Sequence, residues 1–387
     1  MTLKEQTQRI SKIIETYDNQ GIHRTGTEED MKNAQWLAEE IKSLGLEPVM
    51  DGFTINRIDV KESSLKIGDR KIKGFPLFDS ITNNNEVITG SLGRFNSNAI
   101  LGTSLISRDQ NLEKERSRNR HQGLVIAKKG PFPGLFLINA HSFKKPYGPP
   151  VLQISNETWP WIEQMARKNA EATLAIQSLR TKIKVYNVIA LLEGKQSELP
   201  PLIITTPRSG WWHCASERGG GIAGFLEIIH TLCSISPRRN IIFLANTGHE
   251  LGNIGMEHYI TTHPTLAMAA IAWIHLGANF AAANLTQYGI KTPPLVVSQA
   301  SDIEIQELAL KCMSNEGVKP DLTMPIGKIP PRSEAQNIHK KGGRYFSLIG
   351  SNNYYHHPGD RWPKAVDIDK TVKIIKGLVQ LAIELAN

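Results

Sequence analysis

The chain has few cysteines and no long apolar segment. Its 387 residues include only Cys214, Cys233 and Cys312, and no two of them form a Cys-x-x-Cys pair. This scarcity excludes a disulfide framework and a thiolate zinc site, and it favours a reducing compartment. The most apolar window, residues 266–283, contains His275 and Asn279, which are both costly in a lipid bilayer. We therefore read it as a buried strand with its exit loop, and we expect no membrane association.

Targeting and nucleic-acid signals are also missing. Charged residues recur every few positions in the opening segment MTLKEQTQRISKIIETY, so it lacks the apolar region of a signal peptide and we expect a cytoplasmic protein. The 45 Lys and Arg against 37 Asp and Glu give a formal net charge of +8. Because the basic residues are scattered, apart from Lys114 to Arg120, we expect no nucleic-acid partner.

The composition is that of an ordinary globular protein. Hydrophobic residues make up 40% of the chain and charged residues 21%, which excludes a disordered or collagen-like chain. Apolar residues at helical spacing predict an amphipathic helix from Glu28 to Leu44, followed by Gly45 as its C-cap. From Asp51 to Val185, short apolar runs are broken by Gly, Pro and Asn, which predicts a β-rich insert with one helix near 159–169. We therefore predict a split catalytic domain, residues 1–54 with 186–387, and an inserted domain, residues 55–185.

After Tyr186, apolar strands alternate with helices. The near-continuous apolar strands favour an α/β fold with a mixed, largely parallel sheet flanked by helices. The predicted strands are NVIALLEG, LPPLIITTP, NIIFLANTG, MAAIAWIHLG and YFSLIG, and the predicted helices lie near 219–232, 253–261, 302–315 and 367–386.

Polar residues stand where these strands end, which is where sites form in such sheets. Several imidazoles and carboxylates at neighbouring strand ends suit a divalent metal such as zinc or iron. The residues in question are Arg208, His249, Glu250, His275, Tyr355 and His356, with His213, Cys214, Glu217 and Arg218 in the loop before the helix at 219.

Five segments point to a known family. They are HRTGTEEDMKNAQWLAEEIKSLGLEP, KVYNVIALLEG, CASERGGGIAGFLEI, NTGHELGNIG and YYHHPGDRWPKAVDIDK. Their order and spacing resemble the zinc aminopeptidase and glutaminyl cyclase family, the family 28 metallopeptidases, with a protease-associated insert. The resemblance implies a zinc exopeptidase-like fold and a metal site.

The active site departs from the family pattern. A ligand histidine is replaced at Thr206, the family's catalytic glutamate by His249, and an aspartate by His275. What remains implies one divalent ion, zinc, held by Glu217, Glu250 and His356 with an open fourth position. His213 and His275 are further candidates, either as metal ligands or as residues that orient the ligands. The alternative is a metal-free site in which Arg208 or Arg218 pairs with Glu217.

The predicted mechanism follows from these replacements. His249 is predicted to relay the proton as general base, with a role as metal ligand as its alternative. Arg208 and Arg218 are candidates to hold a substrate carboxylate, and Trp212 and Tyr355 to line the substrate site. We predict a metal-dependent hydrolase of an amide or peptide-like bond in a small molecule or short peptide. The alternatives are a catalytically silent binding protein and acyl transfer of the glutaminyl cyclase type.

Overall fold

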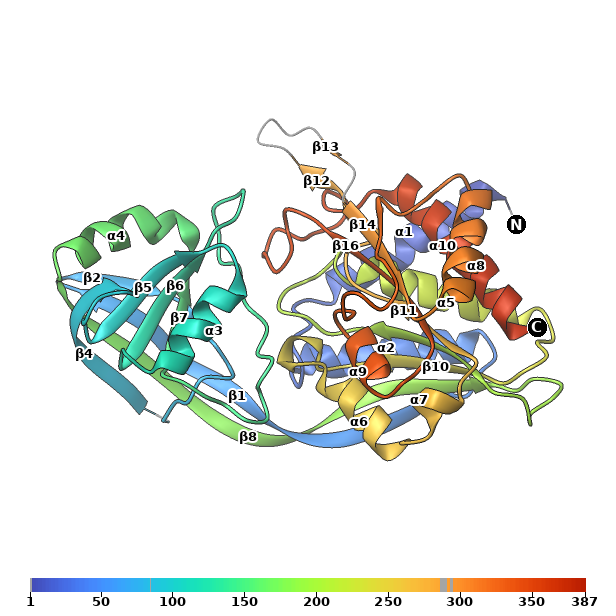
Figure 1. The fold of residues 1–387 in the computed structure, drawn as a ribbon, viewed down its shortest axis with the longest axis horizontal. Coiled ribbons are helices and arrows are strands. Elements are labelled where there is room, and N and C mark those ends of the chain that lie inside the picture. Colours follow the sequence, from blue (N-terminus) through green and yellow to red (C-terminus); the bar gives the residue numbers. More distant parts are fainter. Residues whose placement is uncertain (1, 84, 286–290, 293–294) are drawn as a thin grey trace.

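The computed structural model describes residues 2–83, 85–285, 291–292 and 295–387. Figure 1 shows two lobes of unequal size, with both chain ends in the larger one. Two long strands, β1 (Val49–Ile67) and β8 (Glu171–Leu192), run along one edge of both lobes. They pair antiparallel from Val49 and Ile189 to Lys66 and Thr173. The lobes are therefore joined by a continuous two-stranded ribbon.

The larger lobe is built on a mixed, largely parallel sheet, as predicted. Its four central strands are mutually parallel, in the order β16 (Tyr345–Ser351), β11 (Ala272–Leu276), β9 (Leu202–Pro207) and β10 (Ile241–Asn246). β8 closes one side antiparallel to β10. On the other side β14 (Leu295–Ala300) lies antiparallel to β16, and β15 (Leu322–Thr323) pairs with β14.

Helices cover both faces of this sheet, because its strands are apolar on both sides. One core contains residues of α1 (Leu3–Asn19), α2 (Glu28–Ser43), α5 (Gly219–Cys233), α8 (Ile303–Asn315) and α10 (Ile368–Ala386). The opposite core contains residues of α6 (Ile254–Thr262), α7 (Leu266–Ala269) and α9 (Ala335–Lys340). A one-turn 3₁₀ helix, η2 (His249–Leu251), follows β10, and β12 (Asn284–Leu285) pairs antiparallel with β13 (Lys291–Thr292).

The helices expected after Tyr186 are confirmed to within a residue or two, but one predicted strand is partly wrong. Residues 266–269 of the apolar window form α7, and only 272–276 form the strand β11. Both α7 and β11 are apolar, and a short apolar run does not distinguish a helical turn from a buried strand.

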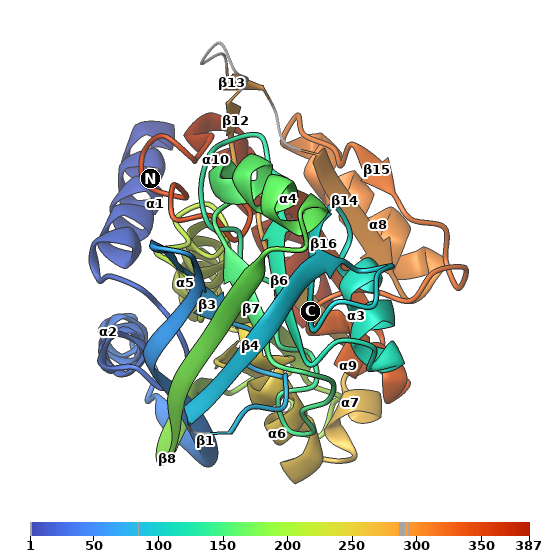
Figure 2. The same cartoon turned by 90° about the vertical axis from the view of Figure 1, so that its left-hand side faces the viewer.

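The smaller lobe contains most of residues 55–185, hereafter the insert. Figure 2 faces it and shows β4 beside β8, with α4 above them. The strands are β2 (Arg70–Lys73), β3 (Phe75–Pro76), β4 (Asn85–Arg94), β5 (Leu101–Ile106), β6 (Gly123–Lys128) and β7 (Val151–Ile154); the helices are α3 (Asp109–Arg118), η1 (Asn156–Thr158) and α4 (Trp159–Arg167).

The expectation of a single helix in the insert is wrong, because α3 is also present. α3 has the sequence DQNLEKERSR, in which Leu112 is the sole apolar residue. Its other buried residues, Glu115 and Arg116, are charged. A helix that buries charged side chains carries no apolar periodicity, so the pattern does not reveal it.

The predicted domain boundaries, residues 54 and 186, fall inside β1 and β8. The backbone therefore passes from one lobe to the other without leaving the ribbon, and the division into a split catalytic domain and an inserted domain stays a prediction. Among the described residues, no helix combines the length and the apolar character needed to cross a lipid bilayer.

Candidate active site

The candidate side chains gather where the parallel strands of the larger lobe end. Arg208 directly follows β9, His249 begins the turn after β10, and His275 lies near the end of β11. Tyr355 and His356 follow β16. Because these strands are neighbours in the sheet, residues more than 140 positions apart in sequence reach one place, as expected for a parallel sheet.

Arg208 is tied to helix α2 and not to the site. Its Nη1 lies 2.6 Å from Oδ1 of Asp30 and donates to Asn33 and to the Asp30 carbonyl, while Nη2 donates to the Tyr186 carbonyl at 2.6 Å. The side chain is 1% exposed. Asp30 is in place because Thr27 caps α2 and the backbone N–H of Gly26 donates to Asp30 Oδ2. We therefore do not retain Arg208 as a substrate ligand.

Glu250 is fully buried, and both of its carboxylate oxygens accept hydrogen bonds. Oε1 accepts from the backbone N–H of Thr25 at 2.6 Å, and Oε2 accepts from the hydroxyl of Ser209 at 2.8 Å. Ser209 Oγ in turn accepts from the N–H of Gly248 at 2.8 Å and of His249 at 3.2 Å. Glu250 thereby fixes the turn after β10 to the end of β9.

Glu217 forms a buried ion pair with its neighbour Arg218. Nη2 of Arg218 lies 2.7 Å from Oε1 of Glu217, and the two side chains are 0% and 1% exposed. Nε2 of His356 lies 3.5 Å from the same oxygen, and Nδ1 of His356 donates to the Leu137 carbonyl at 2.7 Å. Burial raises the pKa of the Glu217 carboxyl, but the charges of Arg218 and His356 outweigh it and hold that pKa below its ordinary value. Glu217 is therefore a carboxylate.

The loop that carries Glu217 and Arg218 is fixed from two sides. Asp360 accepts hydrogen bonds from the N–H groups of Ser216 at 2.8 Å and Glu217 at 3.0 Å. Nε of Arg218 donates to the carbonyl of Ser209 at 2.7 Å. The loop before α5 is thus locked against the segments that follow β9 and β16.

His249 belongs to a second cluster, centred on Glu334. Nδ1 of His249 lies 2.8 Å from Oε1 of Glu334, and Nε2 of His275 lies 3.3 Å from Oε2. His275 is bonded through its other nitrogen to the hydroxyl of Ser347 at 2.8 Å, and Ser333 donates to Glu334. Burial raises the pKa of Glu334, but both histidines outweigh it and keep that pKa well below its ordinary value. Glu334 is a carboxylate that holds one ring nitrogen of each imidazole.

The remaining predicted residues have defined partners. His213 is bonded through Nδ1 to the carbonyl of Asp18 at the end of α1, at 2.9 Å. Trp212 donates to the carbonyl of His356 at 3.0 Å, and the ring of Tyr355 packs 3.8 Å from that of His356, centroid to centroid. Trp212 and Tyr355 therefore both contact His356, and we call these three residues the His356 wall; His213 instead faces α1.

One segment of the insert, residues 133–141, covers this wall. Its Leu137 N–H donates to the carbonyl of His356 at 3.2 Å, and its Ala140 N–H donates to the carbonyl of Glu250 at 2.8 Å. Asn139 accepts from the indole N–H of Trp211 at 2.9 Å. The insert thus contacts both the Glu217 cluster and the turn that carries His249.

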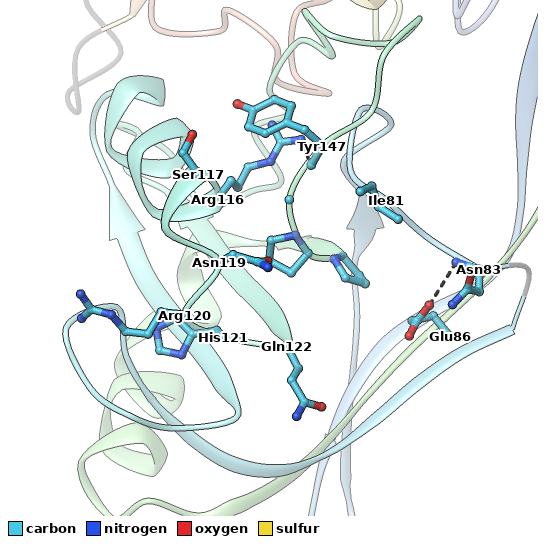
Figure 3. A pocket seen from close by; sticks show the side chains of 13 residues that line it. Ile81, Asn83, Glu86, Arg116, Ser117, Asn119, Arg120, His121, Gln122 and Tyr147 are labelled. Carbon is cyan, nitrogen blue, oxygen red and sulfur yellow. Dashed lines mark hydrogen bonds between the residues drawn. The ribbon is translucent and has the colours of Figure 1, made fainter.

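The insert also contains a cavity of 640 Å³ that lies apart from these residues. Figure 3 shows its lining, which comes from Ile81, Asn83 and Glu86 and from the segments 116–122 and 147–150. Arg116 contributes its charge to the fold, because it pairs with Asp79 at 2.9 Å and lies 3.9 Å from the ring centroid of Tyr147. None of the candidate site residues lines this cavity.

Sequence reasoning missed Glu334, Asp30 and Asp360. Glu334 precedes the short helix α9 and follows no strand, and Asp30 lies in a helix that looked purely structural. Asp360 lies in the quoted segment YYHHPGDRWPKAVDIDK but has no ligand spacing. A carboxylate after a Pro-Gly turn was the single available signal, and it indicates a hydrogen-bond acceptor for loop N–H groups.

Comparisons with known proteins give a family match for the sequence and similar solved structures for the fold. The model described as "Peptidase family M28" matches residues 187–382. The zinc aminopeptidase from Bacillus subtilis superposes with a TM-score of 0.75 at 17% identity, over 98% of this chain and 94% of that one. A peptidase M28 precursor from Shewanella amazonensis gives a TM-score of 0.74 at 16% identity, over 99% and 96%. These matches confirm the fold and support a peptidase-like hydrolase.

A third match concerns part of the chain. A stretch of 131 residues is 24% identical to transferrin receptor protein 2 from Homo sapiens, and it covers 32% of this chain. The chain spans 16% of that receptor's length.

The likeness to a zinc aminopeptidase suggests a divalent metal ion, which the donors of this site do not fit. Structural and catalytic zinc sites need at least three converging nitrogen, oxygen or sulfur ligands. Within the described ranges, no group of three His, Cys, Asp or Glu residues is arranged to hold a metal ion. Of the three predicted ligands, Glu250 has both oxygens engaged, and Glu217 already faces the cation of Arg218.

Proposed function

The chain belongs to peptidase family M28, and from this premise we propose that it hydrolyses an amide or peptide-like bond in a small substrate, with His249 as general base. The observation that carries the proposal is the hydrogen bond of 2.8 Å between Nδ1 of His249 and Glu334. A carboxylate at Nδ1 keeps the proton on that nitrogen and leaves Nε2 as the basic atom.

The hydrogen-bonded pair of His249 and Glu334, hereafter the Glu334–His249 dyad, supports a defined sequence of proton transfers. Nε2 of His249 removes a proton from the attacking water, whose oxygen bonds to the substrate carbonyl carbon. The resulting imidazolium is stabilised by Glu334, whose low pKa keeps it ionised. The imidazolium then returns the proton to the leaving nitrogen as the C–N bond breaks. The products are a carboxylic acid and an amine, and His249 ends neutral.

Tyr355 is the proposed donor to the carbonyl oxygen. Burial raises the pKa of its phenol far above the ordinary value, and Glu217 adds to this shift, so the hydroxyl stays protonated. A neutral donor on this half-buried side chain would stabilise the charge that develops on the oxygen in the transition state. Trp212 is retained as a substrate-contacting residue because it shares the wall with Tyr355.

The test is hydrolysis of a panel of aminoacyl 4-nitroanilides and dipeptides by the full chain. The His249→Ala variant is expected to lower kcat by about 10² to 10⁴ with a normal melting temperature. The matched control is His339→Ala, since His339 is an exposed histidine on α9, close to Glu334 in sequence. If His249→Ala keeps the wild-type kcat, His249 is not the base.

A second candidate is a catalytically silent binding protein with the peptidase fold. The pairing of Glu217 with Arg218 favours it, because the carboxylate is neutralised inside the protein and neither side chain is more than 1% exposed. A wild-type chain that hydrolyses no member of the panel supports this second candidate.

Several finer features stay proposals. The likeness of the insert to a protease-associated domain and acyl transfer of the glutaminyl cyclase type rest on the sequence resemblance. A reducing, cytoplasmic compartment rests on the free thiols of Cys214, Cys233 and Cys312.

A further inference from the structure

Of the three predicted metal ligands, Glu217 and His356 lie close to each other, and the guanidinium of Arg218 lies beside them. Oε1 of Glu217 and Nε2 of His356 lie 3.5 Å apart, and Nη2 of Arg218 lies 2.7 Å from the same Oε1. A divalent ion bound to that oxygen at about 2.0–2.2 Å would lie within a few ångströms of the guanidinium. Two cations at that separation in a buried site repel each other strongly.

The Arg218 side chain is held beside Glu217 by burial and by its hydrogen bonds. Its side chain is 0% exposed, its Nε is bonded to the carbonyl of Ser209, and its backbone N–H is bonded to the carbonyl of Cys214 at 2.9 Å. It is also the N-cap residue of α5, so its backbone is set by the start of that helix. A guanidinium cannot lose its proton in a protein, so its charge stays in place.

The third predicted ligand, Glu250, does not complete a metal coordination shell with Glu217 and His356. Glu250 accepts one hydrogen bond on each oxygen, from Thr25 and Ser209, and these bonds join two strand ends. Among the described residues no third His, Cys, Asp or Glu joins Glu217 and His356 in a group arranged to hold a metal ion, and the two bonds fix the Glu250 carboxylate in its own position.

We infer that the guanidinium of Arg218 takes the place of the divalent ion, so that Glu217, Arg218 and His356 form a metal-free centre in the folded chain. The inference does not rest on the proposed function. The Glu334–His249 dyad and the Glu217–Arg218 pair are distinct interactions, so a metal found beside Glu217 leaves the assignment of His249 open to its own test.

The test measures zinc binding and thermal stability of the full-length chain. After incubation with zinc chloride and dialysis, mass spectrometry should find below about 0.1 zinc per chain, and EDTA or added zinc should leave the melting temperature unchanged. Retention of about one zinc per chain, or a melting temperature that falls with EDTA, overturns the inference.

A double-mutant cycle examines the pair itself. Arg218→Met and Glu217→Gln should each lower the melting temperature by about 5 °C or more, because each leaves a buried group without its partner. The double variant should lose less than the sum of the two single losses, and none of the four proteins should respond to zinc. Additive losses contradict the inference. If the variants fail to fold, the zinc content and EDTA response of the wild type decide the question.

Discussion

Nδ1 of His249 lies 2.8 Å from Oε1 of Glu334, although 85 positions separate the two residues in the chain. Glu334 is 0% exposed and also holds His275, so two imidazoles from two other segments share its carboxylate. The histidine ring is thereby oriented by the tertiary structure, as a general base requires.

We expect Glu334→Gln to lower kcat by about 10² or more with little change in KM, because the amide holds Nδ1 without stabilising the imidazolium. Kinetics on the best substrate of the panel check this. Gln336→Glu, the reverse exchange two positions further along the chain in α9, serves as the control and should keep wild-type kinetics. A Glu334→Gln variant with normal kcat would limit Glu334 to a structural role.

We expect Asp30→Ala to destabilise the fold by about 3–5 kcal/mol, since it leaves the buried Arg208 without its carboxylate. Urea unfolding followed by circular dichroism measures the loss. Glu28→Ala is the matched control: Glu28 lies in the same turn of α2, but its pair with Lys32 is exposed, and its unfolding curve should stay close to wild type. Equal stabilities for the two variants would contradict the structural role of Arg208.

Gly252 tests the contact between the insert and the turn that carries His249. It has a φ of +83°, and a Cβ there would lie 2.7 Å from the backbone oxygen of His141. Gly252→Ala therefore adds a clash to the cost of about 1–2 kcal/mol for a left-handed alanine.

Gly317→Ala is its control, because Gly317 has a φ of +66° with nothing within 4 Å of the added atom. We expect Gly252→Ala to be the less stable of the two and to speed amide hydrogen exchange in residues 137–141. Matching exchange rates in the two variants would show that this contact does not hold the insert in place.

His23 predicts how stability depends on pH. Burial, opposed by its bond to the Tyr17 carbonyl and aided by the charges of His213 and Arg208, lowers the pKa of His23 from 6.5 to about 3. Between these values the unfolded chain binds a proton that the folded chain excludes, so the free energy of unfolding falls as pH drops, by up to roughly 1.4 kcal/mol per unit. The contribution is complete above pH 6.5.

Chemical unfolding of wild type and His23→Gln between pH 4 and 7 checks this expectation. The variant should lose less stability on acidification than the wild type, and the exposed control His339→Gln should follow the wild type. Parallel curves for His23→Gln and wild type would assign the acid sensitivity to other groups.

The sequence predicted the fold where the pattern of apolar residues lies within a short stretch of the chain. Apolar runs such as LIITT and FLAN mark the central strands, and the 3.6-residue spacing in α2 and α10 marks their buried faces. The sequence did not reveal α3, because two of its three buried side chains are charged. It did not reveal α7, because four apolar residues are too few to show a period.

The positions of the candidate site were predictable for the same reason, and its interactions were not. Parallel strands bring their ends together, so the sequence alone placed Arg208, His249 and His356 at one edge of the sheet. Which atoms then meet depends on distance and direction in space. Arg208 pairs with Asp30 of α2, a partner that the sequence did not indicate.

The sequence by itself determined the fold class, the strand ends and the residue types available for chemistry, because each depends on neighbours within a few positions. Only the tertiary structure decided that Glu334 orients His249, that Glu250 joins two strand ends, and that Arg218 faces Glu217. Buried charges must find partners wherever the packed chain provides them, and the geometry of packing, more than residue type or spacing, selects each partner.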